Sequence, residues 1–181
     1  MPNVRGGKTR PNPEPPHPPM QVPGPSPRGP AVAEWRRPPI LDLTRVLDVP
    51  RSRVFALWSN SDHMARWWGP RGFTLVSCRI DFRPGGVFRF TMRGPDGRDY
   101  PFEGTYSDVV PPERIAFRGT IDGDNEVMTT VTFVEHDGKT TLSVYQTYMV
   151  ESDSTRGAHE GWAQTLERLA EYLAHPSQAR S

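Results

Sequence analysis

The sequence STRGAHEGWAQTLERLAEYLA, from Ser154 to Ala174, decides the fold. Its spacing predicts a helix, with one apolar face made by Trp162, Leu166, Leu169, Ala170 and Leu173. His159 lies three residues before Trp162 on the same stripe. The polar residues 152–154 are N-cap candidates, and Pro176 ends the helix. A helix of about 20 residues is roughly 30 Å long, enough to cross a small sheet.

Two glycines, Gly157 and Gly161, interrupt this helix, and each costs it about 1 kcal/mol relative to alanine. Their spacing of four residues indicates a helix face that some other group approaches closely. Tight packing on a strand or loop is the favoured interpretation, and room for a ligand is the alternative.

Composition excludes several classes of protein. The 181 residues are enough for one domain with additional segments, and the net charge of +1 argues against nucleic-acid binding. The single cysteine, Cys78, excludes an intramolecular disulfide and metal sites with several thiolates, so we expect no metal and no cofactor. The sequence contains no apolar run of about 18 residues and no recognisable signal peptide, which predicts a cytoplasmic protein without a membrane span.

The first 39 residues differ from the rest in composition. They are rich in proline, carry few apolar residues and are predicted to be a disordered or polyproline-like tail. A spacer, or upstream sequence before a true start at Met20 instead of Met1, is the favoured interpretation; a ligand for a proline-recognising domain or a polyanion tether is the alternative. The folded domain is predicted over 40–175, and 176–181 form a second disordered end.

The first part of the domain reads as one strand and two short helices. Ile40 to Asp48 alternates apolar and polar residues, which predicts a strand. Pro50 suits the first position of a short helix. Residues 59–62 break that helix and can cap a second one, which ends at Gly69-Pro70.

From Phe73 onward the apolar period drops to two, which predicts six strands joined by tight turns. In the first of these strands Val76, Cys78, Ile80 and Phe82 are predicted to share one face. The strands need a cover for their apolar face, and the C-terminal helix is long enough to provide it. The fold class is therefore α+β: a curved antiparallel sheet of about seven strands, with two short helices after the first strand and a long C-terminal helix on the concave face.

This order of elements resembles the helix-grip fold of the START-related superfamily, also called SRPBCC. Specific stretches resemble the family of homologues of the activator of the heat-shock protein 90 ATPase. In chain order they are Pro50 with Val54-Phe55-Ala56-Leu57-Trp58; Trp67-Trp68-Gly69-Pro70; Asp81-Phe82-Arg83-Pro84-Gly85-Gly86; Gly104-Thr105-Tyr106; Pro112-Glu113-Arg114-Ile115; and Gly161-Trp162. The resemblance covers Ile40 to His175.

The resemblance implies a hydrophobic cavity between the sheet and the long helix, which superfamily members use for lipids, polyketides, hormones and aromatic compounds. In the eukaryotic co-chaperone a separate N-terminal domain binds the chaperone. The proline-rich segment 1–39 is not such a domain, which argues against activation of a chaperone ATPase. Fold likeness by itself does not transfer function.

No nucleophile elbow, zinc-protease motif or phosphate-binding loop is present in the sequence. His159, Asp81 and Tyr106 are the candidate acid or base residues, and a packed histidine without catalytic role is the favoured interpretation of His159. Cys78 is interpreted as a small buried apolar residue. Of the neighbours Trp67 and Trp68, one is expected to face inward and the other to flank an opening.

The candidate ligand-binding residues are mainly aromatic and face the expected cavity, although either a filled core or an open cavity would need such residues. They are Trp67, Trp68, Cys78, Phe88, Phe90, Phe102, Tyr106, Phe117, Val131, Gln146, Tyr148, His159, Trp162 and Leu166. Gln146 stands at an inward position, where a polar side chain needs a partner: a ligand, a hydroxyl or a buried water.

Binding of a hydrophobic or aromatic small molecule without catalysis is the leading hypothesis. A cyclase, aromatase or hydrolase using the same cavity is the second, so enzymatic activity stays open. An interaction module acting on a chaperone ATPase is the third, and a homodimer is retained as an alternative to a monomer.

Overall fold

The computed structural model describes residues 40–121, 125–148 and 153–175. The side chains of Ile40, 121, 125 and 153–156 are also outside the description. The predicted tails at 1–39 and 176–181 lie outside the described residues.

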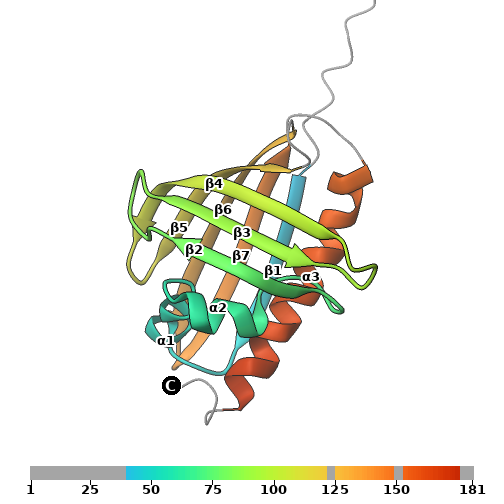
Figure 1. Ribbon diagram of the computed structural model, residues 1–181. Coiled ribbons are helices and arrows are strands. Elements are labelled where there is room, and N and C mark those ends of the chain that lie inside the picture. The colour runs from blue at the N-terminus through green and yellow to red at the C-terminus, as the bar shows by residue number, and fades with distance from the viewer. Residues whose placement is uncertain (1–39, 122–124, 149–152, 176–181) are drawn as a thin grey trace, which may run out of the picture. The chain divides into compact units, whose positions relative to one another are not determined.

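Within the described residues the chain forms seven strands and three helices (Figure 1). In chain order they are β1 (Ile40–Leu47), α1 (Arg51–Ala56), α2 (Ser61–Trp67), β2 (Thr74–Ile80), β3 (Val87–Arg93), β4 (Asp99–Val110), β5 (Arg114–Ile121), β6 (Asn125–His136), β7 (Lys139–Tyr148) and α3 (Asp153–Ala174).

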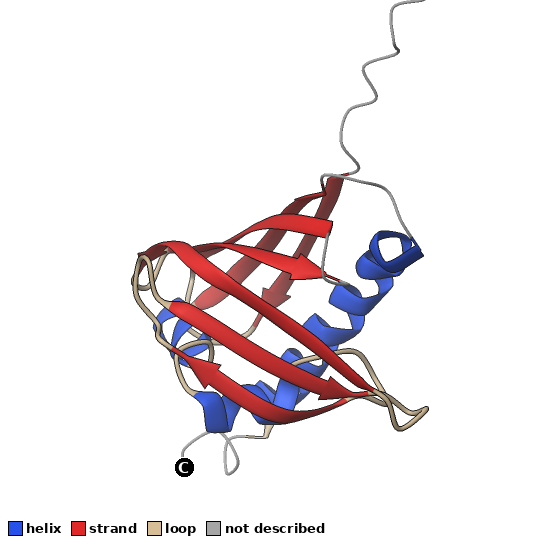
Figure 2. Ribbon diagram, turned by 45° about the horizontal axis from the view of Figure 1, so that its top comes forward, coloured by secondary structure: helices blue, strands red, loops and turns tan. Residues whose placement is uncertain are grey.

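The strands form one antiparallel sheet in the order β1-β7-β6-β5-β4-β3-β2, visible as the curved red layer of Figure 2. The predicted meander is confirmed, because each of the strands β2 to β7 pairs with its neighbours in sequence. The first strand joins the other edge: Leu41 pairs with Gln146 of β7, and Leu47 pairs with Thr140. The alternating pattern of β1 does not reveal this partner.

Helix α2 begins where the sequence signal places it, and α1 begins one residue later than predicted. The side chain of Asn60 caps α2 by accepting hydrogen bonds from the backbone N–H groups of Asp62 at 2.8 Å and His63 at 3.2 Å. Helix α1 begins at Arg51, so Pro50 occupies the N-cap position and not the first helical position. One residue is the usual uncertainty of a helix boundary.

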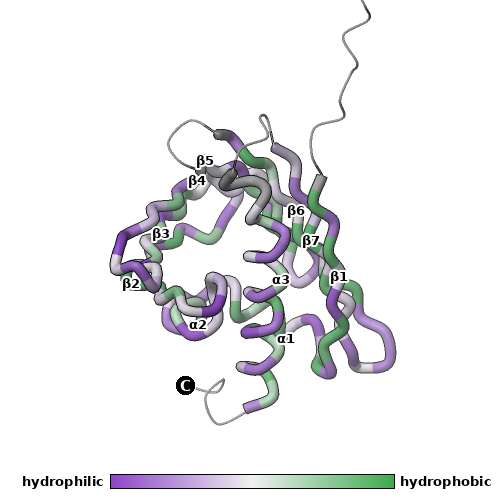
Figure 3. The backbone as a smooth tube through the Cα atoms, turned by 90° about the vertical axis from the view of Figure 1, so that its right-hand side faces the viewer, coloured by the Kyte–Doolittle hydropathy of each residue, from purple (hydrophilic) through white to green (hydrophobic). Residues whose placement is uncertain are grey.

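The long helix α3 lies on the concave side of the sheet. In Figure 3 the two edges of the sheet, β2 and β1, stand on opposite sides of α3. Leu166, Leu169 and Leu173 of its apolar stripe are buried. This arrangement confirms the α+β helix-grip fold.

One predicted strand face is wrong at a single residue. Val76 is 45% exposed, whereas its neighbour Leu75 is buried. The pairing of β2 with β3 shifts register between Leu75 and Ser77, as a β-bulge does, and the bulge turns Val76 away from the face that carries Cys78 and Ile80.

Aromatic side chains of neighbouring strands pack directly on one another inside the sheet. The ring of Phe88 lies 5.0 Å from Phe90, 5.2 Å from Phe102 and Tyr106, and 5.4 Å from Phe117, measured between ring centroids. Because these rings contact one another and bury their surfaces, the region where β3, β4 and β5 carry them is a filled core.

Candidate functional site

A cavity of about 820 Å³ lies between the first half of α3, the segment after α2 and the β3–β4 hairpin. This volume falls within the roughly 300–1,000 Å³ of ligand pockets in proteins. Its lining residues are Trp68, Gly69, Pro70, Arg71, Phe73, Met92, Arg98, Asp99, Tyr100, Pro101, Phe102, Gln146, Gly157, Ala158, Glu160, Gly161, Trp162, Gln164 and Thr165.

The cavity walls are mainly apolar, and its charged residues stand among exposed partners. Arg71 forms ion pairs with Glu171 and Glu167 of α3. Asp99 is paired with Arg93, and the Glu160 carboxylate accepts a hydrogen bond from Gln164 Nε2 at 2.7 Å. Arg98 lies 3.9 Å from the Asp96 carboxylate. The lining residues therefore add two positive and two negative charges, which cancel.

Gly157 and Gly161 form the part of α3 that faces this cavity. A Cβ atom built on either glycine would have no neighbour within 4 Å. The favoured interpretation of these glycines, tight packing, is therefore wrong within the described residues, because no strand or loop among them approaches either position. The alternative, free room beside the helix, agrees with the structure.

Four tryptophan rings pack together at the inner side of the cavity, and two of them form its wall. Trp68 and Trp162 line the cavity, with ring centroids 5.5 Å apart in an edge-on arrangement. Behind them Trp58 packs against both rings, at 5.7 Å from Trp68 and 6.3 Å from Trp162, and Trp67 packs 5.0 Å from Trp58. Trp67 is fully buried, so of the two neighbours one faces the core and the other the opening.

Gln146 of β7 links the sheet to α3 beside the cavity. Its Oε1 atom accepts a hydrogen bond from Trp162 Nε1 at 2.7 Å and another from Thr129 Oγ1 at 3.1 Å. The side chain is only 3% exposed, and it lines the cavity. A buried glutamine needs hydrogen-bond partners, and the carbonyl oxygen of Gln146 has two: the indole of Trp162 and the hydroxyl of Thr129.

Arg168 of α3 fastens the segment that follows α2, which forms one side of the cavity. Gly69, with φ of +92°, turns the chain there and leaves several carbonyl groups pointing the same way. The guanidinium donates from Nη1 to the carbonyl oxygens of Trp68 (3.1 Å), Gly69 (2.8 Å), Pro70 (3.3 Å) and Phe73 (3.3 Å), and from Nη2 to Arg66 (3.3 Å). Burial, with Arg71 nearby, lowers the pKa of Arg168 from its ordinary value.

Comparison with known proteins identifies the relatives of this chain. The family model described as Activator of Hsp90 ATPase homolog 1-like protein matches residues 48–174, more than half of the sequence. The chain belongs to this family. A comparison with curated proteins finds no match.

Solved structures similar to this family member include two bacterial proteins that are matched over nearly their whole length. One, from Chromobacterium violaceum, is 28% identical, with a TM-score of 0.68 over 75% of this chain and 98% of that chain. The AHSA1 protein of Silicibacter pomeroyi is 25% identical, with a TM-score of 0.67 over 75% of this chain and 98% of that chain. The resemblance inferred from the sequence is confirmed, and the family and fold support a ligand-binding or activator-type domain.

In this family member the predicted ligand-binding residues divide into two groups. Four of them line the cavity: Trp68, Phe102, Gln146 and Trp162. The others, except His159, are buried or half-buried in the core without lining it: Trp67, Cys78, Phe88, Phe90, Tyr106, Phe117, Val131, Tyr148 and Leu166. Burial of the Tyr148 hydroxyl, which makes no hydrogen bond among the described residues, raises its pKa to about 12.

Several lining residues were missed by the sequence analysis. Phe73, Met92 and Ala158 belong to the apolar wall, and Thr165 lies deeper on α3. Tight turns between the strands were predicted, but a predicted turn does not indicate that the strand ends beside it face a helix. Gly157 and Gly161 were the available signal for this wall.

The three candidate acid or base residues do not line the cavity. His159 is exposed, which corrects its expected place on the buried stripe. Asp81 is exposed and forms an ion pair with Arg83 at 2.8 Å. Tyr106 is buried among the rings of Phe82, Phe88 and Phe117, and burial raises its pKa above the ordinary value.

We expect the thiol of Cys78 to be nearly inert in the folded protein. Burial, with the Asp62 charge adding to it, raises the pKa of Cys78 to about 11 from an ordinary 9.0. Because the thiolate is the nucleophile, alkylation by iodoacetamide at pH 8 should be about 100-fold slower than in urea-unfolded chain. The buried thiol stabilises the fold while protonated, and this contribution declines as pH rises from about 9 to about 11. Equal alkylation rates in both states would contradict this assignment.

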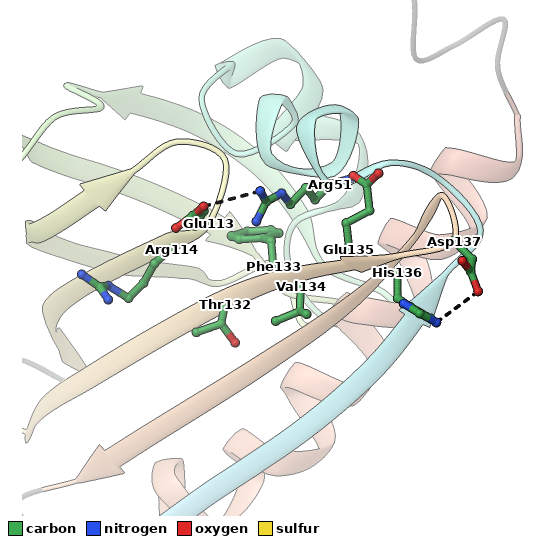
Figure 4. A pocket seen from close by; sticks show the side chains of 9 residues that line it. All are labelled: Arg51, Glu113, Arg114, Thr132, Phe133, Val134, Glu135, His136 and Asp137. Carbon is green, nitrogen blue, oxygen red and sulfur yellow. Dashed lines mark hydrogen bonds and ion pairs between the residues drawn. The ribbon is translucent and has the colours of Figure 1, made fainter.

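A second pocket, of about 650 Å³, lies where α1 meets the ends of β5 and β6 (Figure 4). Figure 4 shows Arg51 directed at Glu113, 3.4 Å away, and His136 beside Asp137. The backbone N–H of Arg51 also donates to Glu135 at 2.9 Å. Its charged groups thus have neighbours of opposite charge on the exposed surface, where such pairs contribute little.

The described residues contain no group of three histidine, cysteine, aspartate or glutamate side chains placed to hold a metal ion. None of the helices in this part of the chain is both long and apolar enough to cross a membrane.

Proposed function

We propose that the cavity beside α3 binds a hydrophobic or aromatic small molecule. The observation that carries this proposal is the open space over Gly157 and Gly161, opposite a wall of aromatic rings. Helical glycines cost about 1 kcal/mol each relative to alanine, and no neighbouring group in residues 40–121, 125–148 or 153–175 requires them. A ligand seated against the helix backbone gives these positions a role.

The apolar character of the walls supports the same class of ligand. Trp68 and Trp162 offer ring faces and edges, and Phe73, Met92 and Phe102 complete the apolar lining. Removing such surfaces from water is favourable by about 25 cal/mol per Å² of apolar area. Met92 also gives the wall a flexible thioether, which adapts to ligands of different shapes.

Catalysis is not proposed, because His159, Asp81 and Tyr106 do not line the cavity. The family description names activation of the Hsp90 ATPase. No surface of the described residues favours that activity over ligand binding, so ligand binding is the conclusion.

The test is a ligand panel added to the full-length chain. The panel should contain fatty acids, fatty methyl esters, aromatic ketones and polycyclic hydrocarbons. Saturable quenching or enhancement of tryptophan fluorescence is expected for part of the panel, because Trp68 and Trp162 line the cavity. A ligand at 100 times its Kd should stabilise the fold by about 2.7 kcal/mol, measured as a rise in Tm. A panel that changes neither Tm nor fluorescence would rule the proposal out.

A further inference from the structure

We infer that the bound molecule is uncharged and carries one hydrogen-bond acceptor oxygen, as in a ketone, ester, amide or quinone, which accepts from Gln146 Nε2. This inference rests on the proposed function and adds the chemistry of the ligand. It starts from a buried donor group at the cavity that no protein acceptor uses.

The orientation of the Gln146 side chain is set by its neighbours. Trp162 Nε1 and Thr129 Oγ1 both point hydrogens at one end of the amide, at 2.7 Å and 3.1 Å, and that end must therefore be the carbonyl oxygen Oε1. The other end is the NH₂ group. Within the described part of the chain no acceptor lies at hydrogen-bond distance from this Nε2.

Gln146 is 97% removed from solvent, since its exposed fraction is 3%, and the surface it retains belongs to the cavity. When a ligand covers this surface, an amide hydrogen left without an acceptor costs about 1–3 kcal/mol. An acceptor oxygen on the ligand would recover that cost, whereas a pure hydrocarbon would bury the donor further.

Two polar groups of the residues that line the cavity beside Gln146 are already engaged. Thr165 Oγ1 donates its hydrogen to the carbonyl oxygen of Gly161 at 2.7 Å. The indole N–H of Trp162 is donated to Gln146 itself. Gln146 Nε2 is therefore a donor that the inner wall presents to a ligand, and the indole N–H of Trp68, which also lines the cavity, is the other.

Charge argues for an uncharged acceptor. Arg168 of α3 donates its guanidinium hydrogens to backbone carbonyls of the segment 66–73. Arg98 lies on the exposed side of the cavity, 3.9 Å from the Asp96 carboxylate. Arg71 is paired with Glu171. A carboxylate deep in the cavity would lose its hydration without gaining a cation, which is strongly unfavourable.

The test compares matched ligands that differ in the acceptor alone. The probes are 9-fluorenone against fluorene, and 2-nonanone against nonane, titrated into the full-length chain by calorimetry or by tryptophan fluorescence. Each ketone should bind about 10-fold more tightly than its hydrocarbon, after correction for their different solubilities in water. The carbonyl stretching frequency of bound fluorenone should fall relative to its value in alkane, as it does on hydrogen bonding.

The Gln146→Met variant is made in a Trp162→Phe background, because the loss of Gln146 Oε1 would otherwise free the indole N–H of Trp162 to donate to the ketone. This double variant should reduce the ketone preference to about onefold, whereas Trp162→Phe alone keeps Gln146 Nε2 and should keep the preference. A matched control is Thr140→Val, which removes another buried polar group of β7, one that bonds the Val49 carbonyl far from the cavity. This control should keep the preference of the wild type. The preference is a ratio within one variant, so a general loss of stability cancels.

The outcomes separate the two proposals. Binding of ketones and hydrocarbons with equal corrected affinity, with no frequency shift, overturns the acceptor assignment and leaves the proposed function standing. Absence of binding by all four probes overturns both. If the double variant does not fold, the wild-type affinity ratio and the carbonyl frequency still decide.

Discussion

Replacing Gly161 with phenylalanine should weaken ligand binding about 100-fold while the protein still folds. The side chain at position 161 projects into the cavity, where nothing lies within 4 Å of a Cβ. A benzyl group there occupies space that the ligand needs against α3. Calorimetric titration with a ligand from the panel measures the loss, and the far-UV circular dichroism spectrum and Tm report the fold.

Stability should move in the opposite direction from binding when the new side chain is small. Gly161→Ala removes a helical glycine without a clash, so it should raise the free energy of unfolding by about 1 kcal/mol. His159→Phe is the matched control for the bulky variant, since His159 is exposed on the same helix and does not line the cavity. It should bind ligand as the wild type does. Wild-type affinity in Gly161→Phe would mean that the ligand sits elsewhere.

Replacing Arg168 with methionine should lower the free energy of unfolding by about 2–3 kcal/mol, because a charged donor to buried carbonyls is lost. The guanidinium is shared among the carbonyl oxygens of Trp68, Gly69, Pro70 and Phe73. Methionine keeps much of the aliphatic length but donates nothing. Urea unfolding measures the change, and Tm should fall by about 6–10 °C.

The segment 66–73 should also open more often in Arg168→Met, because it loses its tie to α3. Faster amide hydrogen exchange confined to that segment is the expected signature. Arg168→Lys keeps the charge but not the forked geometry, and it should fall between the two. Arg118→Met is the surface control: its side chain is exposed, 3.6 Å from Glu126, and its loss should change stability by less than about 0.5 kcal/mol. A change this small at Arg168 would contradict the role assigned to it.

The spacing of apolar residues was sufficient to predict those elements whose structure depends on that spacing alone. The two-residue alternation gave the strands of the meander, and the spacing of Leu166, Leu169 and Leu173 gave the buried side of α3. Alternation does not register an inserted residue, so the bulge at Val76 was missed. It also carries no information about partners, which is why the pairing of β1 with β7 was not predicted.

The site was harder to predict because burial depends on what lies opposite a residue. His159 and Leu166 are seven residues apart and lie on the same side of α3, but they are separated by roughly 10 Å along the helix axis. Leu166 meets the core, and His159 is exposed. In the same way Phe88 is enclosed by other rings while Phe102 also borders open space, although both are inward aromatic residues of adjacent strands.

The most direct test of the central claim, that the cavity beside α3 holds the ligand, is NMR of ¹³C-labelled methionine methyl groups. Met92 lines the cavity, Met64 is buried in the core, and Met128 is 53% exposed on another part of the sheet. On addition of the panel compound that raises Tm most, the Met92 methyl signal should shift and show nuclear Overhauser contacts to ligand protons, while the Met128 signal stays in place. An unchanged Met92 signal at saturating ligand, or ligand contacts at Met128 instead, would contradict the account.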